Sequence, residues 1–178
     1  MASSVAIGAA GEEIVHRAAC GARLMCWRGN ATADAQGVDR YIRNLGVRRP
    51  ALGLQVKTTE AAAEEVCAFT VKDGETFRSR YLDRGIVIVF VFALGFGIVL
   101  PGVDLGPLDW CGAQTIKYTA GAAAFRDVLG DLYCASRAEL GQRLRGLLDL
   151  LEKGDPTLEP LKREPRTRGE KRKRELQE

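Results

Sequence analysis

The chain has 178 residues, which is enough for one folded domain with a hydrophobic core and too few for two large domains. Hydrophobic residues make up 46% and charged residues 28%, proportions that exclude a disordered polymer for most of the chain. The net charge is +3, but the segment from Lys162 onward holds eight Lys or Arg against four Asp or Glu. Without that surplus of four the remaining body carries −1, so the body gives no electrostatic reason to bind a polyanion.

Cysteine usage and the N-terminal residues favour a cytoplasmic protein. The five cysteines are an odd number and form no CxxC pair, so we expect reduced core thiols and neither disulfides nor zinc ligation. The first residues, "MASSVAIGAAGEE", lack the basic and apolar regions of an export signal. The apolar residues 85–100 are too few for a membrane helix, and we predict two buried strands there and no membrane partner.

The first half of the chain shows one helical pattern followed by strand patterns. Residues 12–25 place Ile14, Ala18 and Leu24 near one helical face, with the acidic Glu12 and Glu13 expected in the first turn. Short apolar or alternating runs separated by turn residues follow this helix. Strands are expected at residues 25–30, 38–45, 51–58 and 66–71.

The second half is predicted to add a short helix at 75–82, the apolar strand pair, and helices at 122–133 and 136–154. Ser136 is an expected N-cap with Glu139 three residues on, and Gly154 is an expected stop. The last helix carries a leucine stripe, interpreted as core cover or as a dimer surface. The order predicts an α/β domain over residues 1–155, with a mixed central sheet and C-terminal helices, and a basic, flexible tail over residues 156–178.

Two polar residues stand together inside the apolar strand "ALGLQVKT". Gln55 and Lys57 are two residues apart, so both side chains point to one face of the sheet. If the preceding strand pairs as a hairpin, the Asp39 carboxylate can lie next to Gln55. With the Val56 carbonyl these groups make a set of hard oxygen ligands suited to Mg²⁺ or Mn²⁺, leaving Lys57 to act on a phosphate or a water.

Spacing alone does not establish a site. An Asp followed by a QxK sequence occurs by chance in many chains, and a lysine in a strand is commonly a device against aggregation. In this structural interpretation Lys57 is an edge charge and Asp39 a turn residue, and their side chains would diverge.

Three motifs together resemble a known superfamily. "GEEIV" on the first helix, "GVDRYI" at the start of a strand and "LGLQVKTT" in the next strand resemble the PD-(D/E)XK, restriction-endonuclease-like superfamily. They are most similar to a bacterial branch long labelled a domain of unknown function, with GE, G-[IV]-D and QVK motifs. The stretches "SRYLDRGIVIVFVF" and "LDWCG" are also similar, so the resemblance covers about residues 8 to 115.

The resemblance implies a restriction-endonuclease-like α/β/α core and roles for individual residues. Asp39 and Gln55 would be metal ligands, Lys57 the catalytic lysine, and Glu12 a carboxylate that reaches the metal through water. Glutamine stands where the superfamily usually has glutamate, so the site has one negative charge fewer and should hold its cation more weakly. A homodimer is expected by analogy with enzymes that cut both strands.

We therefore predict a Mg²⁺-dependent endonuclease that cleaves phosphodiester bonds, of DNA in the first instance, in defence or DNA processing. The alternative is an inactive module of the same fold that binds nucleic acid or a partner protein. The basic tail is interpreted as a nucleic-acid contact or as a solvated end. Its candidate contacts are Lys171, Arg172, Lys173 and Arg174.

Overall fold

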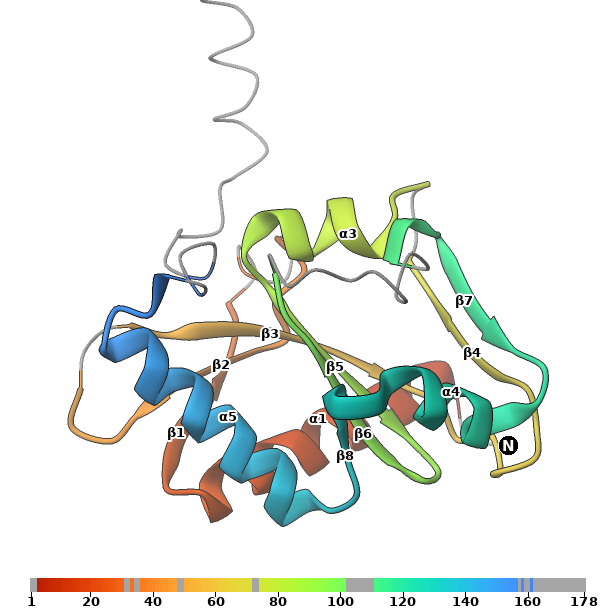
Figure 1. The fold of residues 1–178 in the computed structure, drawn as a ribbon, viewed down its shortest axis with the longest axis horizontal. Helices are drawn as coiled ribbons and strands as arrows, with labels where there is room; N and C mark the ends of the chain where they lie inside the picture. Colours follow the sequence, from red (N-terminus) through yellow and green to blue (C-terminus); the bar gives the residue numbers. More distant parts are fainter. Residues whose placement is uncertain are drawn as a thin grey trace, which may run out of the picture.

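The chain folds as a mixed α/β protein in the computed structural model (Figure 1). The structure describes residues 3–30, 33, 36–47, 50–71, 74–101, 111–156, 158 and 161. The helices in this part are α1 (Ser4–Gly21), α3 (Phe77–Arg80), α4 (Gly121–Leu129) and α5 (Arg137–Glu152), with 3-10 turns η1 (Leu82–Arg84) and η3 (Gly130–Leu132). The strands are β1 (Leu24–Arg28), β2 (Arg40–Asn44), β3 (Leu52–Thr58), β4 (Cys67–Thr70), β5 (Val87–Phe92), β6 (Gly95–Val99), β7 (Thr115–Tyr118) and β8 (Tyr133–Cys134).

Helix α1 begins and ends earlier than the predicted helix over residues 12–25. The Ser3 hydroxyl accepts a hydrogen bond from the backbone N–H of Ala6 at 3.3 Å and caps the helix start. Glu12 and Glu13 therefore lie in the middle of α1, and the prediction that they occupy the first turn is wrong. The helix ends where Arg23 adopts a positive φ of 60°, and the chain then enters β1.

A six-stranded sheet forms the centre, in the order β1-β2-β3-β5-β6-β8. Strands β3 and β5 pair in parallel, and the other neighbours pair antiparallel, which confirms the predicted mixed sheet. Strands β2 and β3 form the expected hairpin, with Arg40 opposite Leu54. The candidate residues of β3 thus lie at the middle of the sheet.

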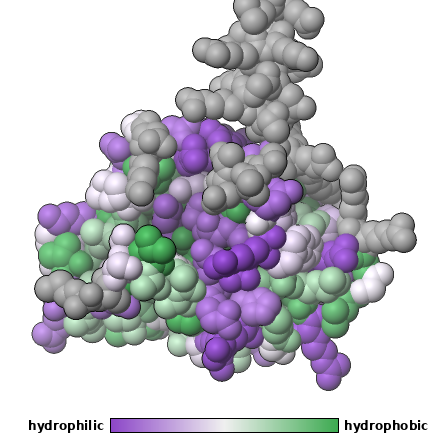
Figure 2. All heavy atoms as spheres, turned by 180° about the vertical axis from the view of Figure 1, so that it is seen from behind, coloured by the Kyte–Doolittle hydropathy of each residue, from purple (hydrophilic) through white to green (hydrophobic). Residues whose placement is uncertain are grey.

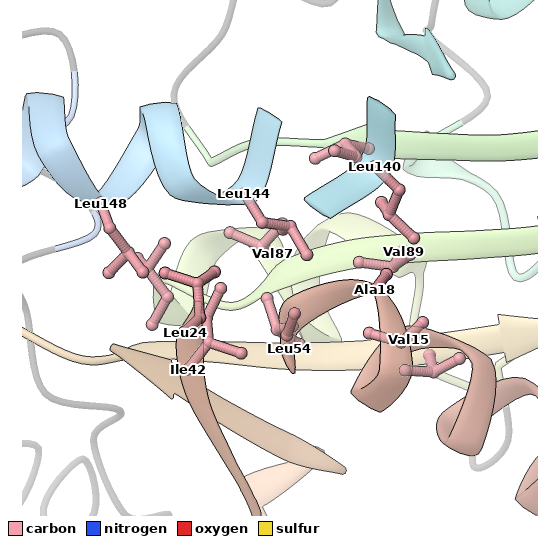
Figure 3. Packing of buried hydrophobic residues seen from close by; sticks show 14 of the residues in the cluster. Val15, Ala18, Leu24, Ile42, Leu54, Val87, Val89, Leu140, Leu144 and Leu148 are labelled. Carbon is pink, nitrogen blue, oxygen red and sulfur yellow. The ribbon is translucent and has the colours of Figure 1, made fainter. Parts of the chain in front are cut away.

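Helices α1 and α5 cover one face of this sheet with a buried apolar cluster (Figure 3). The helices approach closely at Gly141, where an added Cβ would overlap the carbonyl oxygen of Ala18. The leucine stripe of α5 is core cover: Leu140, Leu144, Leu148 and Leu151 are buried and Leu147 is partly buried against them. This stripe is therefore not available as a dimer surface.

Strands β4 and β7 form a separate two-stranded sheet on the opposite face, beside α3 and α4. Aromatic rings fill the space between the layers: Phe69 lies 4.6 Å from Phe90 and 5.2 Å from Phe125, between ring centroids. Phe69 is thus a core residue. Strand β7 was not predicted, because its four residues alternate polar and apolar side chains too briefly for a pattern to stand out.

The predicted helices of the C-terminal part are interrupted by a strand. Helix α4 ends at Leu129, and Tyr133 and Cys134 pair with β6 where a helix over 122–133 was expected. Helix α5 agrees with the prediction: the Ser136 hydroxyl accepts from the Glu139 N–H at 3.1 Å. A two-residue strand is specified by its partner and not by its own sequence.

The packed body continues beyond the predicted boundary at residue 155, since Leu158 and Leu161 are buried in the α1–α5 cluster. All five cysteines are free thiols; Cys67, Cys111 and Cys134 are buried, as expected for core thiols, whereas Cys20 is exposed and Cys26 is partly buried. Within the described ranges, no helix is long and apolar enough to cross a membrane. Figure 2 shows hydrophilic side chains in the middle of one face, between more apolar areas.

Candidate functional site

Asp39 is fixed against β3 by both its backbone and its side chain. Its N–H donates to the Leu54 carbonyl at 2.9 Å, and its carboxylate oxygen Oδ2 accepts from the Val56 N–H at 2.7 Å. The preceding Gly37 has a positive φ of 85°, and an added Cβ there would lie 2.9 Å from the ring of Tyr81. The "GVD" sequence thus turns the chain so that Asp39 enters the hairpin with its carboxylate over β3.

Gln55 brings the end of its side chain to the same place. Gln55 is only 7% exposed, and its amide nitrogen Nε2 donates to Asp39 Oδ2 and, at 3.1 Å, to the carbonyl oxygen of Val56. The predicted convergence of Asp39, Gln55 and Val56 is therefore present. The structural interpretation expected Asp39, Gln55 and Lys57 to diverge, and the first two of these instead meet.

The donor set at this point is suited to a hard cation. The Gln55 N–H group faces a carboxylate oxygen and a carbonyl oxygen, so it stands where a positive charge would be stabilised. A half-turn of the amide exchanges its nitrogen for Oε1 and would leave three oxygens facing one another. Such a set is stable only with a cation among the oxygens, and carboxylate, amide and carbonyl oxygens are ligands of Mg²⁺ and Mn²⁺.

The carboxylate content of this site is low. Among the residues that the structure describes, no group of three or more His, Cys, Asp or Glu side chains is placed to hold a metal. The converging set contains the single carboxylate of Asp39, with neutral oxygens from Gln55 and Val56. We therefore expect weaker cation binding than a site with two carboxylates would give.

Lys57 lies on the same face of β3 as Gln55, between the central sheet and β4. Its ammonium Nζ donates to the Thr70 carbonyl at 3.3 Å and lies 5.3 Å from the centre of the Tyr81 ring. These two contacts hold the ammonium group of the half-buried Lys57 side chain between Thr70 and Tyr81.

Tyr81 is a wall of the site that sequence reasoning did not assign. Its ring lies beside the Gly37 turn, and the Lys57 ammonium lies over the face of the ring. Burial raises the pKa of the Tyr81 hydroxyl to about 12, with the nearby Asp39 charge adding to the shift, so the hydroxyl stays protonated. Tyr81 stands in the "SRYLDRG" stretch of the resemblance, and that stretch was the signal that could have identified it.

Glu12 is paired with two arginines that sequence reasoning also missed. Its Oε2 lies 3.4 Å from Arg28 Nη2 and 3.4 Å from Arg40 Nε. Arg40 is buried, at 8% exposure, so this pair neutralises a cation that would be costly to bury alone. The alternation of "VDRYIRN" could have placed Arg40 on the helix-facing side of β2.

Glu12 approaches the sheet from the face opposite to Gln55. Arg40 pairs directly with Leu54, and Leu54 belongs to the cluster under α1, so the Glu12–Arg40 pair lies on the α1 side. Gln55 and Lys57 point to the other face. The water-mediated role of Glu12 stays a prediction.

The preceding glycine brings α1 close to β3. A Cβ added at Gly11 would overlap Thr58 Oγ1 and would lie 2.9 Å from Thr58 Cβ. The "GE" pair thus has a local explanation: Gly11 allows the helix to touch the strand, and Glu12 then reaches the arginines. His16, one turn later, lies 3.7 Å from Cys20 through its Nε2.

The remaining predicted contacts lie outside the described residues. These are the candidate nucleic-acid contacts Lys171, Arg172, Lys173 and Arg174. No family model, curated protein or solved structure matches this chain.

Proposed function

We propose that the chain is a metal-dependent nuclease that hydrolyses phosphodiester bonds, with DNA as its first candidate substrate. The observation that carries the proposal is the convergence of the Asp39 carboxylate, the Gln55 amide and the Val56 carbonyl. The held ammonium of Lys57 on the same sheet face supports it. The resemblance to PD-(D/E)XK enzymes adds the reaction class by analogy.

Asp39, Gln55 and Val56 would hold Mg²⁺ or Mn²⁺. When bound, such an ion polarises a phosphodiester and acidifies a water. Asp39 is kept in place by the Val56 N–H, so its carboxylate needs little reorganisation to accept a cation. Rotation of the Gln55 amide would turn a donor into a ligand.

Lys57 would bind the phosphate or orient the attacking water. Its Nζ donates to the Thr70 carbonyl and lies over the Tyr81 ring, and both contacts are compatible with an ammonium that also donates to an anion. Charge that develops on the phosphate oxygens would be stabilised by this ammonium. The proposal therefore assigns substrate binding and charge stabilisation to Lys57.

A binding module is the second candidate, and one observation favours it. In the described geometry the Gln55 N–H satisfies both Asp39 and the Val56 carbonyl, so the site is stable with no ion at all. A module of this kind would bind nucleic acid or a partner protein without turnover.

The test is cleavage of supercoiled plasmid and of labelled single-stranded DNA and RNA with Mg²⁺, Mn²⁺ or EDTA. We expect metal-dependent cleavage by the natural chain and its loss in Lys57→Ala. Lys117→Ala is the matched control, because Lys117 is an exposed strand lysine on β7. If the natural chain is inert with every substrate and metal while it still binds nucleic acid, the nuclease proposal fails and the binding module replaces it.

A homodimer that cuts both strands remains part of the proposal by analogy. Sedimentation of the intact chain, with and without a DNA duplex, measures the assembly. A monomer in both conditions would reject this part alone.

A further inference from the structure

An aromatic and cationic surface lies on the edge strand β1 and its neighbour β2. Trp27 and Tyr41 are directly opposite each other, and their rings stack with 5.7 Å between centroids and 21° between planes. The Arg43 guanidinium lies 5.3 Å from the centre of the Trp27 ring, and its Nε lies 3.3 Å from Met25 Sδ. We call Met25, Trp27, Tyr41 and Arg43 the Trp27 platform.

The platform is on the same sheet face as the candidate site. Tyr41 pairs with Gly53, two residues before Gln55 on β3, and Asp39 is two residues before Tyr41. Side chains two residues apart share a face, so Asp39 and Gln55 continue the surface that Trp27 and Tyr41 begin. Gly53 has no side chain, and an added Cβ would lie 3.6 Å from the Tyr41 ring. That distance is ordinary van der Waals contact, and the tighter neighbour of such a Cβ is the Val38 side chain, at 3.2 Å.

Trp27 and Met25 are the exposed members of the platform, whereas Tyr41 and Arg43 are half-buried and Tyr41 packs against the core. Trp27 is 38% exposed and Met25 37%, whereas the phenylalanines Phe69, Phe77, Phe90 and Phe125 are at most 3% exposed. A purely structural role for Trp27 is cross-strand pairing with Tyr41, which is a common means of stabilising an edge. That role explains the stacked pair but does not require the Arg43 guanidinium over the Trp27 ring.

We propose that the Trp27 platform stacks on an unpaired base of a single-stranded or locally opened nucleic acid whose backbone continues into the Asp39 and Gln55 site. This inference rests on the proposed function, because it names the form of the nucleic-acid substrate. Indole and phenol rings stack on bases without regard to sequence, and an arginine adds a cation beside the phosphates. In a duplex the faces of internal bases are covered, so the platform selects unpaired segments.

Binding is measured in EDTA, where no metal-dependent cleavage competes, by the anisotropy of a labelled single-stranded oligonucleotide added to the full chain. We expect tighter binding of the single strand than of a duplex of the same sequence. Trp27→Ala is expected to weaken single-strand binding about tenfold, while Trp27→Phe keeps most of it. Val66→Ala is the control, since Val66 is an exposed apolar residue away from the platform, at 44%.

A second readout reports the stacking itself. The chain has two tryptophans, so a Trp110→Phe background leaves Trp27 as the only indole. Quenching of its fluorescence by the single strand, and not by the duplex, is expected. Circular dichroism of each variant checks folding, and the anisotropy series in the natural background stands if Trp110→Phe fails to fold.

The outcomes separate this inference from the nuclease proposal. Single-strand binding that depends on Trp27 supports the inference even if no metal-dependent cleavage is found. Unchanged affinity in Trp27→Ala overturns it, even when Lys57-dependent cleavage is present. A preference for the duplex also overturns it.

Discussion

The carboxylate of Asp39 accepts a hydrogen bond from the backbone N–H of Val56, on the neighbouring strand, at 2.7 Å. This contact joins the residue that opens β2 to the strand that carries Gln55 and Lys57. The proposed ligand set is therefore part of the hairpin hydrogen-bond pattern. Changes at Asp39 should affect stability and activity to different extents, and the choice of replacement separates the two.

Asp39→Ala and Asp39→Asn differ in what they leave for Val56. Alanine removes the carboxylate acceptor and leaves the part-buried Val56 N–H without its hydrogen bond. We expect this loss to lower the free energy of unfolding by about 1 to 3 kcal/mol. Asparagine keeps an acceptor oxygen, so its loss should be smaller. Both variants should lose metal-dependent cleavage, because each removes the single negative charge of the proposed ligand set. Urea unfolding of both variants measures the difference, and equal stability would contradict it.

Gln55→Glu should tighten the binding of Mg²⁺ by adding a second negative charge beside Asp39. Cleavage is expected to reach its plateau at a lower Mg²⁺ concentration than in the natural chain. Without metal the two carboxylates repel, which raises the pKa of one of them. Stability in EDTA should then be below that of the natural chain near neutral pH and should recover as the pH falls and the raised group takes up its proton.

That prediction is checked by titrating Mg²⁺ against cleavage and by thermal unfolding in EDTA at several pH values. Gln55→Leu is the matched control, because the leucine side chain has a similar volume and supplies no metal ligand. A Gln55→Glu variant that needs more Mg²⁺ than the natural chain would reject the placement of Gln55 among the ligands.

Gly11→Ala should destabilise the fold, because the added methyl group would overlap Thr58 Oγ1. Either helix α1 or strand β3 must shift, and overpacking of this kind costs about 1 to 3 kcal/mol. Gly8→Ala is the control on the same helix, since nothing lies within 4 Å of its added Cβ. It should instead stabilise the helix by about 0.5 to 1 kcal/mol.

The double variant Gly11→Ala, Thr58→Ala tests the named contact. Removing the Thr58 hydroxyl and methyl groups should recover part of the stability that Gly11→Ala loses, as measured by urea unfolding. No recovery would place the origin of the loss elsewhere than at Thr58.

Four cysteines should make the protein less stable in alkali. Burial raises the pKa of Cys26, Cys67 and Cys134 to about 11 and that of Cys111 to about 12, from a usual value of 9.0. Above about pH 9 the unfolded chain therefore loses thiol protons that the folded chain keeps, and stability falls as the pH rises toward 11. Thermal unfolding as a function of pH measures this fall.

Thiol reactivity gives an independent measurement. At about pH 8 these four thiols should react slowly with a disulfide reagent, whereas the exposed Cys20 reacts first. Mass spectrometry of the labelled native chain identifies the modified residue. Rapid labelling of Cys111, which is fully buried, would contradict the packing around it.

The parts predicted correctly from the sequence depend on local rules. Side chains two residues apart on a strand point to the same face of the sheet, and a short connection between two strands favours a hairpin. Asp39, Gln55 and Val56 were therefore expected to meet. The Ser136 cap of α5 is also local, because the hydroxyl bonds to an N–H three residues away. The spacing of apolar and polar residues and the presence of capping and turn residues are sufficient to predict such features.

The parts that were missed depend on contacts between distant segments. The Glu12–Arg40 pair and the position of Tyr81 over the Gly37 turn are set by packing of α1 and of the α3–η1 region on the sheet. Strand β8 exists because β6 offers it an edge. The early start of α1 was missed because its first two turns are rich in alanine and glycine and show little apolar periodicity.

The packing of α1 against α5 sets the order in which this protein can mature on the ribosome. Helix α1 leaves the exit tunnel first, but Ala18 has its close neighbour Gly141 only after more than a hundred further residues are made. Until then the apolar face of the central sheet lacks half of its cover, and the edge strands can pair with other chains. Nascent chains that stop before α5 are thus expected to need a chaperone, because α5 completes the cover of this sheet face.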